Sequence, residues 1–333
     1  MSYRISILDK SPLAPGETAA QALARTLTLA QQAERWGYHR FWIAEHHNAE
    51  QLASPSPELL IAWILGQTRQ IRVGSGGVML QHYSPYKGAE NFNLLASLAP
   101  GRVDLGVGKA PGGLPLATRA LQQGIHQYEK GSFAEQLTQL DNWLTLTESQ
   151  GEESLRATPI PPRRADGFLL GASVDSARLA ASLDWNFVFA AHLNGDKNLL
   201  QEVLTNWREL SRREVIVAVQ VIVAQDAASA ADLAKQVEVW GVELANGQRV
   251  TVGSESQAAA FARQAGSPPT RIERRESSLL FGTAEEVKAQ LDALQAQWGI
   301  DEFIIDTPIA EGRARLASLG LLAQAHLGAE VTP

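Results

Sequence analysis

The chain has 333 residues, 45% of them hydrophobic, which is enough for one large α/β domain or two smaller ones. Its net charge of −7 argues against a nucleic-acid-binding protein, which would present a basic face. No apolar run approaches the roughly 20 residues that span a bilayer, and the first residues lack the apolar core of a signal peptide. The absence of cysteine excludes disulfides, thiolate metal sites and cysteine nucleophiles. We therefore expect a cytoplasmic protein that binds neither nucleic acid nor membranes.

Short apolar strands alternate with helical segments in the first hundred residues. The hydrophobic pattern predicts strands at Arg4–Leu8, His39–Ala44, Ile71–Gly74 and Val103–Val107, and helices at Glu17–Trp36, Glu58–Thr68 and Tyr86–Leu98. The strands recur roughly every 32 to 35 residues, which indicates a βα repeat with parallel crossovers.

The repeat continues in the second half, with two irregular excursions. Further strands are predicted at Phe168–Leu170, Asn186–Ala190, Glu214–Ala224 and Glu302–Asp306, and helices at Ser132–Thr147, Asp175–Leu183, Lys197–Leu210, Ala227–Trp240, Thr283–Trp298 and Arg313–His326. The first excursion opens as a loop at Lys109 and ends in a polar tail, Glu148–Arg164. The second holds a helix around Ser256–Gln264 and a charged loop, Gly266–Glu276. The chain is thus predicted to be one α/β domain over residues 1–333, a (β/α)₈ TIM barrel with insertions after strands 4 and 7.

Polar residues at the carboxyl end of the second strand are the first candidate site. The apolar run Phe41–Ala44 ends in Glu45, His46 and His47, and the carboxyl ends of the strands form the working face of such a barrel. Neighbouring residues on a strand point to opposite faces, so we expect one histidine in the mouth and the other satisfied in a loop. Zinc binding by His46, His47, His82 and His192 with Glu45 remains an alternative, although the HxH pair of barrel metallohydrolases is absent.

Glycines follow the third strand and a polar turn follows the fifth. Gly76 and Gly77 either make a tight strand exit or leave bare backbone on which a flat ligand can lie. Gly171, Ala172 and Ser173 lead directly into a helix that also carries Ser176, a pattern typical either of an anion site at a helix N-terminus or of simple N-capping.

Ordered motifs over more than 250 residues resemble the luciferase-like flavin monooxygenases. The resemblance is carried by SILDKSPL, FWIAEHHN, IRVGSGGVML, AENFNLLASLAPGRVDLGVGKAPGG, LLGAS, FGTAEEV and DEFIIDT. The likeness is greatest to members similar to bacterial luciferase α chains.

The resemblance implies a role for each matching residue. His46 occupies the position of the family's active-site histidine. Cofactor-binding positions are matched by Glu45, by Gly76 and Gly77 (where the family has a non-prolyl cis peptide against the flavin ring), by Lys109 and Arg119 at the FMN phosphate, and by the turn of Gly171, Ala172, Ser173 and Ser176. His192 would line the substrate pocket. His82 is a further pocket candidate, although it stands one position away from the family pattern. A lid over the site would be the segment 266–278, with Arg271, Arg274 and Arg275.

The activity that the resemblance implies is a two-component, FMN-dependent monooxygenase. Reduced FMN from a separate NAD(P)H:flavin reductase would react with O₂ to a C4a-peroxyflavin that oxidises a small organic substrate, with His46 as the proton-transfer group near neutral pH. No metal is expected, and a homodimer paired through the helices beside strands two and three is the family's common state. Three alternatives remain open: a deazaflavin-dependent oxidoreductase on the same barrel, a flavin-binding protein without turnover, and the metallohydrolase.

Overall fold

The computed structural model describes residues 3–125, 130–146, 148, 155–192 and 195–328. Two sequence-based predictions extend beyond these limits: Thr147, the predicted end of one helix, and residues 149–154 of the polar tail lie outside the described residues. No helix of the described chain is long and apolar enough to cross a membrane.

Eight parallel strands close into a barrel. They are β1 (Arg4–Asp9), β2 (Arg40–Ile43), β3 (Arg72–Met79), β4 (Val103–Gly108), β5 (Asp166–Gly171), β6 (Asn186–Ala190), β7 (Ile216–Val223) and β12 (Glu302–Asp306). Each pairs with the next along the chain, and the pairing of β7 with β12 and of β12 with β1 closes the ring. The predicted (β/α)₈ barrel is therefore confirmed.

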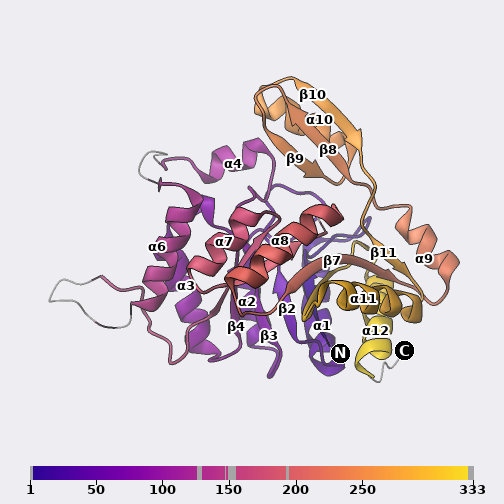
Figure 1. The fold of residues 1–333 in the computed structure, drawn as a ribbon, viewed down its shortest axis with the longest axis horizontal. Coiled ribbons are helices and arrows are strands. Elements are labelled where there is room, and N and C mark those ends of the chain that lie inside the picture. The colour runs from indigo at the N-terminus through magenta and orange to yellow at the C-terminus, as the bar shows by residue number, and fades with distance from the viewer. Residues whose placement is uncertain (1–2, 126–129, 147, 149–154, 193–194, 329–333) are drawn as a thin grey trace.

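Helices cover the outside of the barrel (Figure 1). They are α1 (Ala19–Trp36), α2 (Pro57–Leu65), α3 (Pro85–Leu98), α6 (Phe133–Thr145), α7 (Val174–Ser182), α8 (Lys197–Leu210), α11 (Ala284–Trp298) and α12 (Gly312–Leu327). The first of these, α1, shows how the sequence sets its limits. Thr18 and Gln21 form a capping box, and Gly37 ends the helix in the left-handed conformation with φ 86°.

The alternation of side chains along the strands separates two cores. Leu8, Trp42, Phe168 and Ile304 point into the barrel and pack against one another, whereas the positions between them, such as Ile7, pack under the helices. The same alternation continues beyond the strand ends into the mouth. A residue that follows an inward-facing residue by two positions is therefore expected to face the site.

A buried polar network fills the amino-terminal end of the barrel interior. Arg40 donates to Glu302 and to Asp104 at 2.9 Å each, and Trp42 Nε1 donates to Asp104 at 2.9 Å. Arg72 also binds Asp104, which is fully buried. Burial alone would raise the pKa of Asp104, but Arg40 and Arg72 hold it below its ordinary value.

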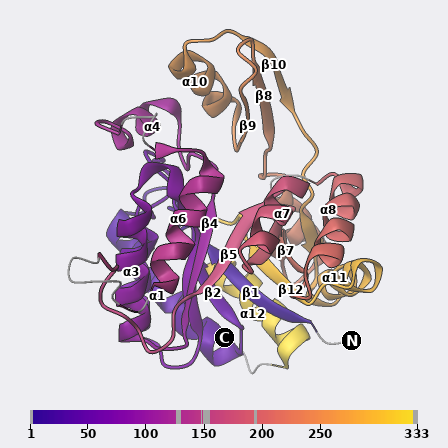
Figure 2. The same cartoon turned by 60° about the vertical axis from the view of Figure 1, so that its left-hand side comes forward.

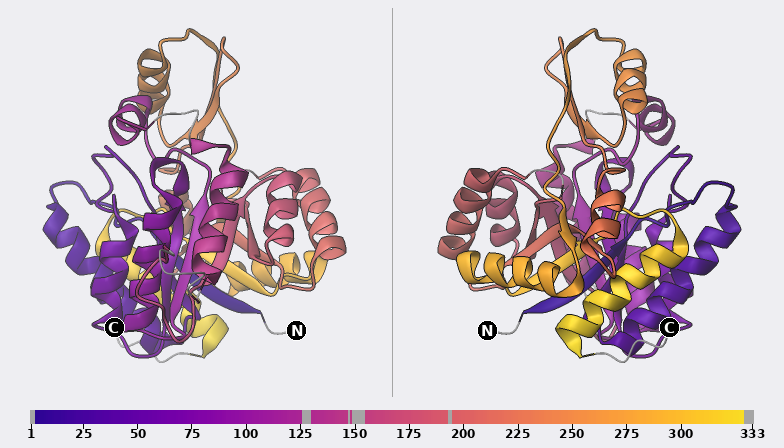
Figure 3. Two further views of the ribbon diagram at one scale, coloured as in Figure 1. Left: turned by 90° about the vertical axis from the view of Figure 1, so that its left-hand side faces the viewer. Right: turned by 90° about the vertical axis from the view of Figure 1, so that its right-hand side faces the viewer.

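Both predicted insertions are present and stand at the carboxyl ends of the strands. The first contains α4 (Pro115–Leu121), a helix that was not predicted from the sequence, and the predicted helix α6. The second contains α9 (Ala227–Ala234), β8 (Trp240–Leu244), β9 (Arg249–Val252), α10 (Glu255–Ala265), β10 (Pro269–Arg274) and β11 (Leu280–Gly282). Figure 2 shows the inserted sheet and α10 beside α4, and both side views in Figure 3 show the orange insertion standing above the barrel, opposite the two termini.

Two secondary-structure predictions for the second insertion are wrong. The helix predicted to run to Trp240 ends at Ala234, because Val242 and Leu244 alternate as a strand and bury against α10. The predicted loop 266–276 contains the strand β10, which pairs antiparallel with β8. Its side chains are mostly exposed, so it carries no apolar alternation that would reveal it. The strand predicted to end at Gly74 instead continues to Met79.

Candidate functional site

Polar side chains occupy the inward positions at the mouth on five consecutive strands of the ring: β6, β7, β12, β1 and β2. Each stands two residues beyond an inward-facing residue of the barrel and so shares its face. These residues are His192, Gln220, Asp306, Lys10 and His46. On β3, β4 and β5 the corresponding inward positions are Gly76, Gly108 and Leu170. The mouth is therefore divided into a polar half and a half of glycine and apolar residues.

The two histidines of the polar half are uncharged at neutral pH. Both rings are partly exposed, and the Nδ1 atom of each is buried without a hydrogen-bond partner among the described residues. Burial, together with the nearby Lys10, lowers the pKa of His46 to about 3 and that of His192 to about 4. The expectation that His46 titrates near neutral pH is therefore replaced: it presents a neutral imidazole that can donate or accept a hydrogen bond.

An ion pair between a partly exposed lysine and a buried aspartate lies between these histidines and was missed in the sequence. Lys10 Nζ lies 2.7 Å from Asp306 Oδ2, and Gln220 Nε2 donates to the same oxygen at 3.1 Å. Asp306 is only 1% exposed; burial would raise the pKa of this carboxyl, but Lys10 and His192 lower it to about 2. Lys10 stands two positions after the inward-facing Leu8, and Asp306 stands two positions after the inward-facing Ile304. This spacing is the sequence signal that could have revealed the pair.

Glu45 turns away from the mouth and joins three protein groups. It accepts from His47 Nε2 at 2.7 Å, from Tyr83 Oη at 2.8 Å and from the amide of Met79 at 3.0 Å. His47 in turn donates its own amide to the carbonyl of Gly112. The adjacent histidines thus differ as their alternation predicts, with His46 in the mouth and His47 satisfied beside a loop. Glu45 ties the end of β3 to the segment after β2.

Gly76 and Gly77 are joined by a cis peptide bond, at a bulge where the register between β3 and β4 shifts. A side chain at Gly76 would meet Leu8 at 2.7 Å and Trp42 at 3.1 Å, and one at Gly77 would meet the backbone of Gly106 at 2.8 Å. Close packing against neighbouring strands therefore explains both glycines. This segment contributes only backbone, and both glycines are buried.

His82 connects the end of β3 to the first insertion. Its Nε2 lies 2.8 Å from the carbonyl oxygen of Pro111 and must donate there, so Nδ1 is left to accept from Gln122 Nε2 at 3.2 Å. Both ring nitrogens are used, and burial lowers the pKa of His82. In this arrangement His82 holds the loop after β4 in place.

The turn after β5 has the form expected of an anion site. Ser173 caps α7, and its Oγ lies 2.9 Å from Ser176 Oγ and accepts the Ser176 amide at 3.2 Å. A Cβ on Gly171 would lie 2.6 Å from Ser176 Cβ, so only glycine lets the helix start this close to the strand. Ala172 stands between them and contributes no polar side chain. The hydroxyls and helix N-terminus are of the kind that binds phosphate.

The two cations expected at this turn lie on the first insertion. Lys109 is exposed directly after β4, and Arg119 is exposed on α4. The Arg119 guanidinium donates to the carbonyl of Gln264 at 3.0 Å, and the Leu116 amide donates to the Gln264 side chain at 3.1 Å. Arg119 therefore connects the two insertions, and the structure gives it no contact with Ser173 or Ser176.

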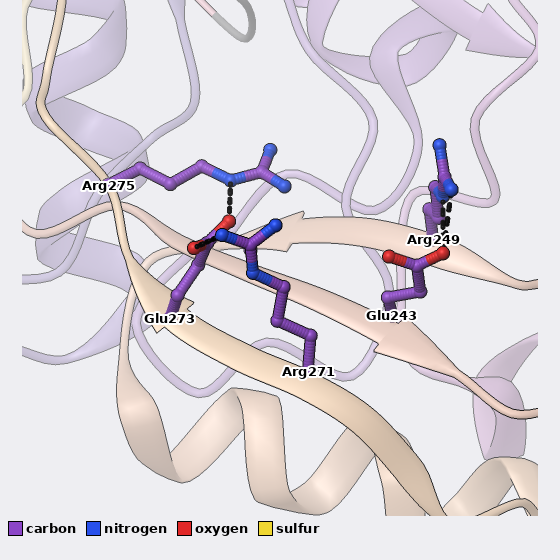
Figure 4. A pocket seen from close by; sticks show the side chains of 6 residues that line it. Glu243, Arg249, Arg271, Glu273 and Arg275 are labelled. Atoms are coloured by element: carbon purple, nitrogen blue, oxygen red, sulfur yellow. Dashed lines mark hydrogen bonds and ion pairs between the residues drawn. The ribbon is translucent and has the colours of Figure 1, made fainter.

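The polar face of the inserted sheet forms a small cavity of about 190 Å³ (Figure 4). Arg249 pairs with Glu243, and both Arg271 and Arg275 pair with Glu273. Arg274 lies 3.5 Å from Glu238. The arginines of the predicted lid are thus engaged by carboxylates of the same insertion, as on an ordinary charged surface.

The donor set of the mouth does not favour a metal. Within the described ranges, no group of three or more His, Cys, Asp or Glu side chains is placed to hold a metal ion. The remaining chemistry is that of a barrel enzyme with a neutral imidazole, a buried ion pair and a phosphate-type turn around one mouth.

Comparison with known proteins places this barrel in a family. The family model described as luciferase-like monooxygenase matches residues 1–302. An N-acetyl-S-alkylcysteine monooxygenase of Bacillus subtilis is 42% identical over 98% of this chain and 99% of its own length. A luciferase-like monooxygenase of Escherichia coli is 32% identical, with 95% of each chain covered.

Solved structures share the fold across the whole chain. The oxygenating constituent of 3,6-diketocamphane monooxygenase of Pseudomonas putida, in complex with FMN, superposes with a TM-score of 0.70, 19% identity and all of each chain covered. An F420-dependent secondary alcohol dehydrogenase gives a TM-score of 0.68 at 14% identity, with 99% of this chain and all of the other covered. At these identities the likeness shows the fold alone.

The fold and the mouth define a (β/α)₈ barrel oxidoreductase. The chain belongs to the luciferase-like monooxygenase family and is an enzyme of that family.

Proposed function

We propose that the protein is an FMN-dependent monooxygenase of the two-component type, which uses reduced FMN and O₂ to oxidise a small organic substrate. The observation that carries the proposal is that one half of the barrel mouth is polar and the other half is formed by glycine and apolar residues. The half formed by β3, β4 and β5 offers bare backbone and apolar surface and ends at the capped turn of α7, whereas the opposite half carries His46, His192 and Lys10. A flat ring with a phosphate tail fits the first half, and a polar substrate fits the second.

The phosphate would be held by the N-terminus of α7, through Ser173 and Ser176 and the backbone at Gly171 and Ala172. Lys109 would add a positive charge from the loop after β4, and Arg119 would do so after exchanging its contact with Gln264. The backbone at Gly76 and Gly77 would face the ring. Reduced FMN supplies the electrons with which one oxygen atom of O₂ enters the substrate and the other leaves as water.

His46 would act on the reacting oxygen. Its imidazole is neutral, and it belongs to a ring of polar groups rather than to a solvent-exposed loop. A neutral imidazole can donate a hydrogen bond and accept a proton as charge develops nearby. Glu45 would act indirectly on the cofactor, because it accepts the Met79 amide and so fixes the end of β3. His82 would shape the pocket indirectly, because it holds the loop at Pro111 in place.

The relative with 42% identity over nearly the full chain, an N-acetyl-S-alkylcysteine monooxygenase, supports a proposal for the substrate class. We propose that this enzyme also acts on a small thioether that carries a carboxylate, with His192 in its binding pocket. Since the sequence lacks a dinucleotide-binding fingerprint, the electrons would come from a separate NAD(P)H:flavin reductase. A soluble, cytoplasmic homodimer is the proposed state.

The direct test supplies chemically reduced FMN, ¹⁸O₂ and N-acetyl-S-methylcysteine to the purified protein. One ¹⁸O atom in the product, with turnover that depends on the protein, is the expected result. Release of all the oxygen as hydrogen peroxide, with no labelled product from any thioether carboxylate, would reject the substrate class. A failure to bind FMN in either redox state would reject the proposed activity itself.

A deazaflavin-dependent oxidoreductase is the second candidate, because an F420-dependent dehydrogenase shares this fold. Hydride transfer by a deazaflavin consumes no O₂, so oxygen uptake coupled to substrate distinguishes the two activities.

A further inference from the structure

Among the described residues, the polar half of the mouth contains one partly exposed cation, and not all of its hydrogen-bond donors are used. Lys10 is partly exposed, with 24% of its side-chain surface accessible, whereas its partner Asp306 is buried. An ammonium group has three N–H donors, and among the described residues only Asp306 accepts from Lys10. Donors therefore remain for a ligand that enters the mouth.

Hydrogen bonds to Asp306 hold the ion pair in place. Asp306 Oδ2 accepts from both Lys10 and Gln220, and the low pKa of this carboxyl keeps it ionised at any physiological pH. Lysine normally loses much side-chain freedom when it binds a ligand, but Asp306 already restricts Lys10 to one position. The arrangement is that of a cation oriented in advance.

The neighbours of Lys10 add hydrogen-bonding groups without adding charge. His46 and His192 both lie within the electrostatic influence of Lys10, and both are neutral because their pKa values are about 3 and about 4. The other ion pair at this end of the barrel is directed differently. Asp9 is 1% exposed and engaged by Arg315, Ser11 and Thr26. Lys10 is therefore the cation that an anion reaches in this half of the mouth.

We propose that Lys10 is the carboxylate-binding residue of the substrate pocket and that Asp306, assisted by Gln220, is its positioning partner. The proposal rests on the substrate class given above and assigns the acid group of that substrate a place opposite the flavin half. A carboxylate would accept the remaining N–H donors of Lys10, which is a charge-assisted hydrogen bond. The thioether end would then be free to extend toward the β3–β5 side.

The test compares an acid with its neutral analogue. Kinetics and calorimetric binding are measured with N-acetyl-S-methylcysteine and with its methyl ester, for the native enzyme and for Lys10→Met and Lys10→Arg. Lys10→Met should lower kcat/KM for the acid about ten- to a hundredfold more than for the ester, chiefly through KM. Lys10→Arg should retain most of the preference, and Asp306→Asn should weaken it.

A matched control uses an exposed lysine far from the mouth. Lys235, which pairs with Asp232 at the surface, can be changed to Met without an expected effect on either ligand. Equal losses for acid and ester in Lys10→Met would overturn the proposal and assign Lys10 to the flavin or to the fold. So would a native enzyme that binds both compounds equally well. If Lys10→Met does not fold, the acid-to-ester ratio of Lys10→Arg and of Asp306→Asn decides the matter.

Failure of the proposed activity is recognised separately. Free reduced FMN also reacts with O₂, so the flavin reaction is reported by the change in its rate when the native protein is added without substrate. A normal flavin reaction with no discrimination between acid and ester rejects only the carboxylate subsite.

Discussion

At the scale of single residues, His46 has an unusual combination of position and charge. Its inward place follows from the alternation along β2, and burial lowers its pKa to about 3. A histidine in such a place acts through a neutral ring, so its contribution should depend on hydrogen bonding rather than on a stored proton.

Replacement of His46 by Gln should leave FMN binding nearly unchanged and reduce oxygenation by roughly 10²- to 10⁴-fold, because acid–base groups contribute effects of that size. Gln occupies similar space and keeps a hydrogen-bond donor and acceptor, so His46→Ala should be the more severe change. The measurement is product formation per reduced FMN consumed. Turnover at the native rate in both variants would show that His46 has no part in the reaction.

The same pKa gives a prediction about stability. In the unfolded chain a histidine binds a proton below about pH 6.5, whereas His46 in the folded protein resists protonation down to about pH 3. The unfolded state therefore binds more protons between these limits, and the free energy of unfolding should fall as the pH is lowered through this window. Each such histidine contributes at most about 1.4 kcal/mol per pH unit. Urea titrations between pH 7 and pH 4 should show a shallower decline for His46→Gln than for the native protein.

At the scale of elements, the buried network at the amino-terminal end of the barrel connects β2, β3, β4 and β12, and Arg72 extends it to Asp166 on β5. Arg40 on β2, Arg72 on β3, Asp104 on β4 and Glu302 on β12 pair with one another, so the removal of Asp104 takes a shared buried carboxylate away from two arginines.

Asp104→Asn should lower the free energy of unfolding by about 3–5 kcal/mol, since breaking a buried ion pair carries that cost. The pKa of Asp104 is depressed, so its contribution is present above about pH 3.9 and is lost as the pH falls through the lower value of the folded state. Chemical denaturation at pH 7 measures the effect. The exposed Asp232→Asn is the control and should change stability by less than about 0.5 kcal/mol. A loss in Asp104→Asn no larger than in this control would contradict the role of the network.

Most elements could be predicted because their patterns are local. The strand Asn186–Ala190 and the helix Lys197–Leu210 have the predicted bounds, since burial on one side and clear caps determine them. The strand β10 could not be predicted, because its exposed side chains carry no period and its pairing partner β8 lies about 30 residues away.

The candidate site was predictable where residues stand at strand ends. His46, His192 and the α7 turn are found this way. Lys10 and Asp306 were missed because a strand-end lysine and aspartate look like ordinary polar boundaries until the closed ring brings β1 and β12 together. The contacts of Glu45 with Met79 and Tyr83 and of His82 with Gln122 could not be foreseen either, because the partners lie 34 to 40 positions apart in the chain.

At the scale of the whole molecule, an apolar surface lies outside the barrel on α2 and α3. Leu59 and Trp63 on α2 are 70% and 42% exposed, and Leu94 and Leu98 on α3 are 49% and 67% exposed. Large exposed side chains on two adjacent helices are typical of a subunit interface, and this is the surface through which the proposed homodimer would form.

Leu59→Asp combined with Leu98→Asp should convert the dimer into a monomer of 36.0 kDa, because two charges in a buried interface oppose association. Sedimentation velocity of the native and variant proteins measures the mass directly. Leu210→Asp, at a 48% exposed leucine on α8, is the matched control and should leave the dimer intact. A native protein that sediments as a monomer would refute the interface.

The two insertions meet above the mouth through Arg119, Leu116 and Gln264, and the barrel mouth beneath them is divided between a backbone-lined half and a polar half. We propose that this mouth holds reduced FMN and directs its reaction with O₂. The most direct measurement is equilibrium binding of oxidised and reduced FMN, followed by rapid mixing of the reduced complex with O₂ under absorbance detection. We predict tighter binding of the reduced form and a transient absorbance species that precedes oxidised FMN. Binding without any such transient, at the rate of free reduced FMN, would contradict the account.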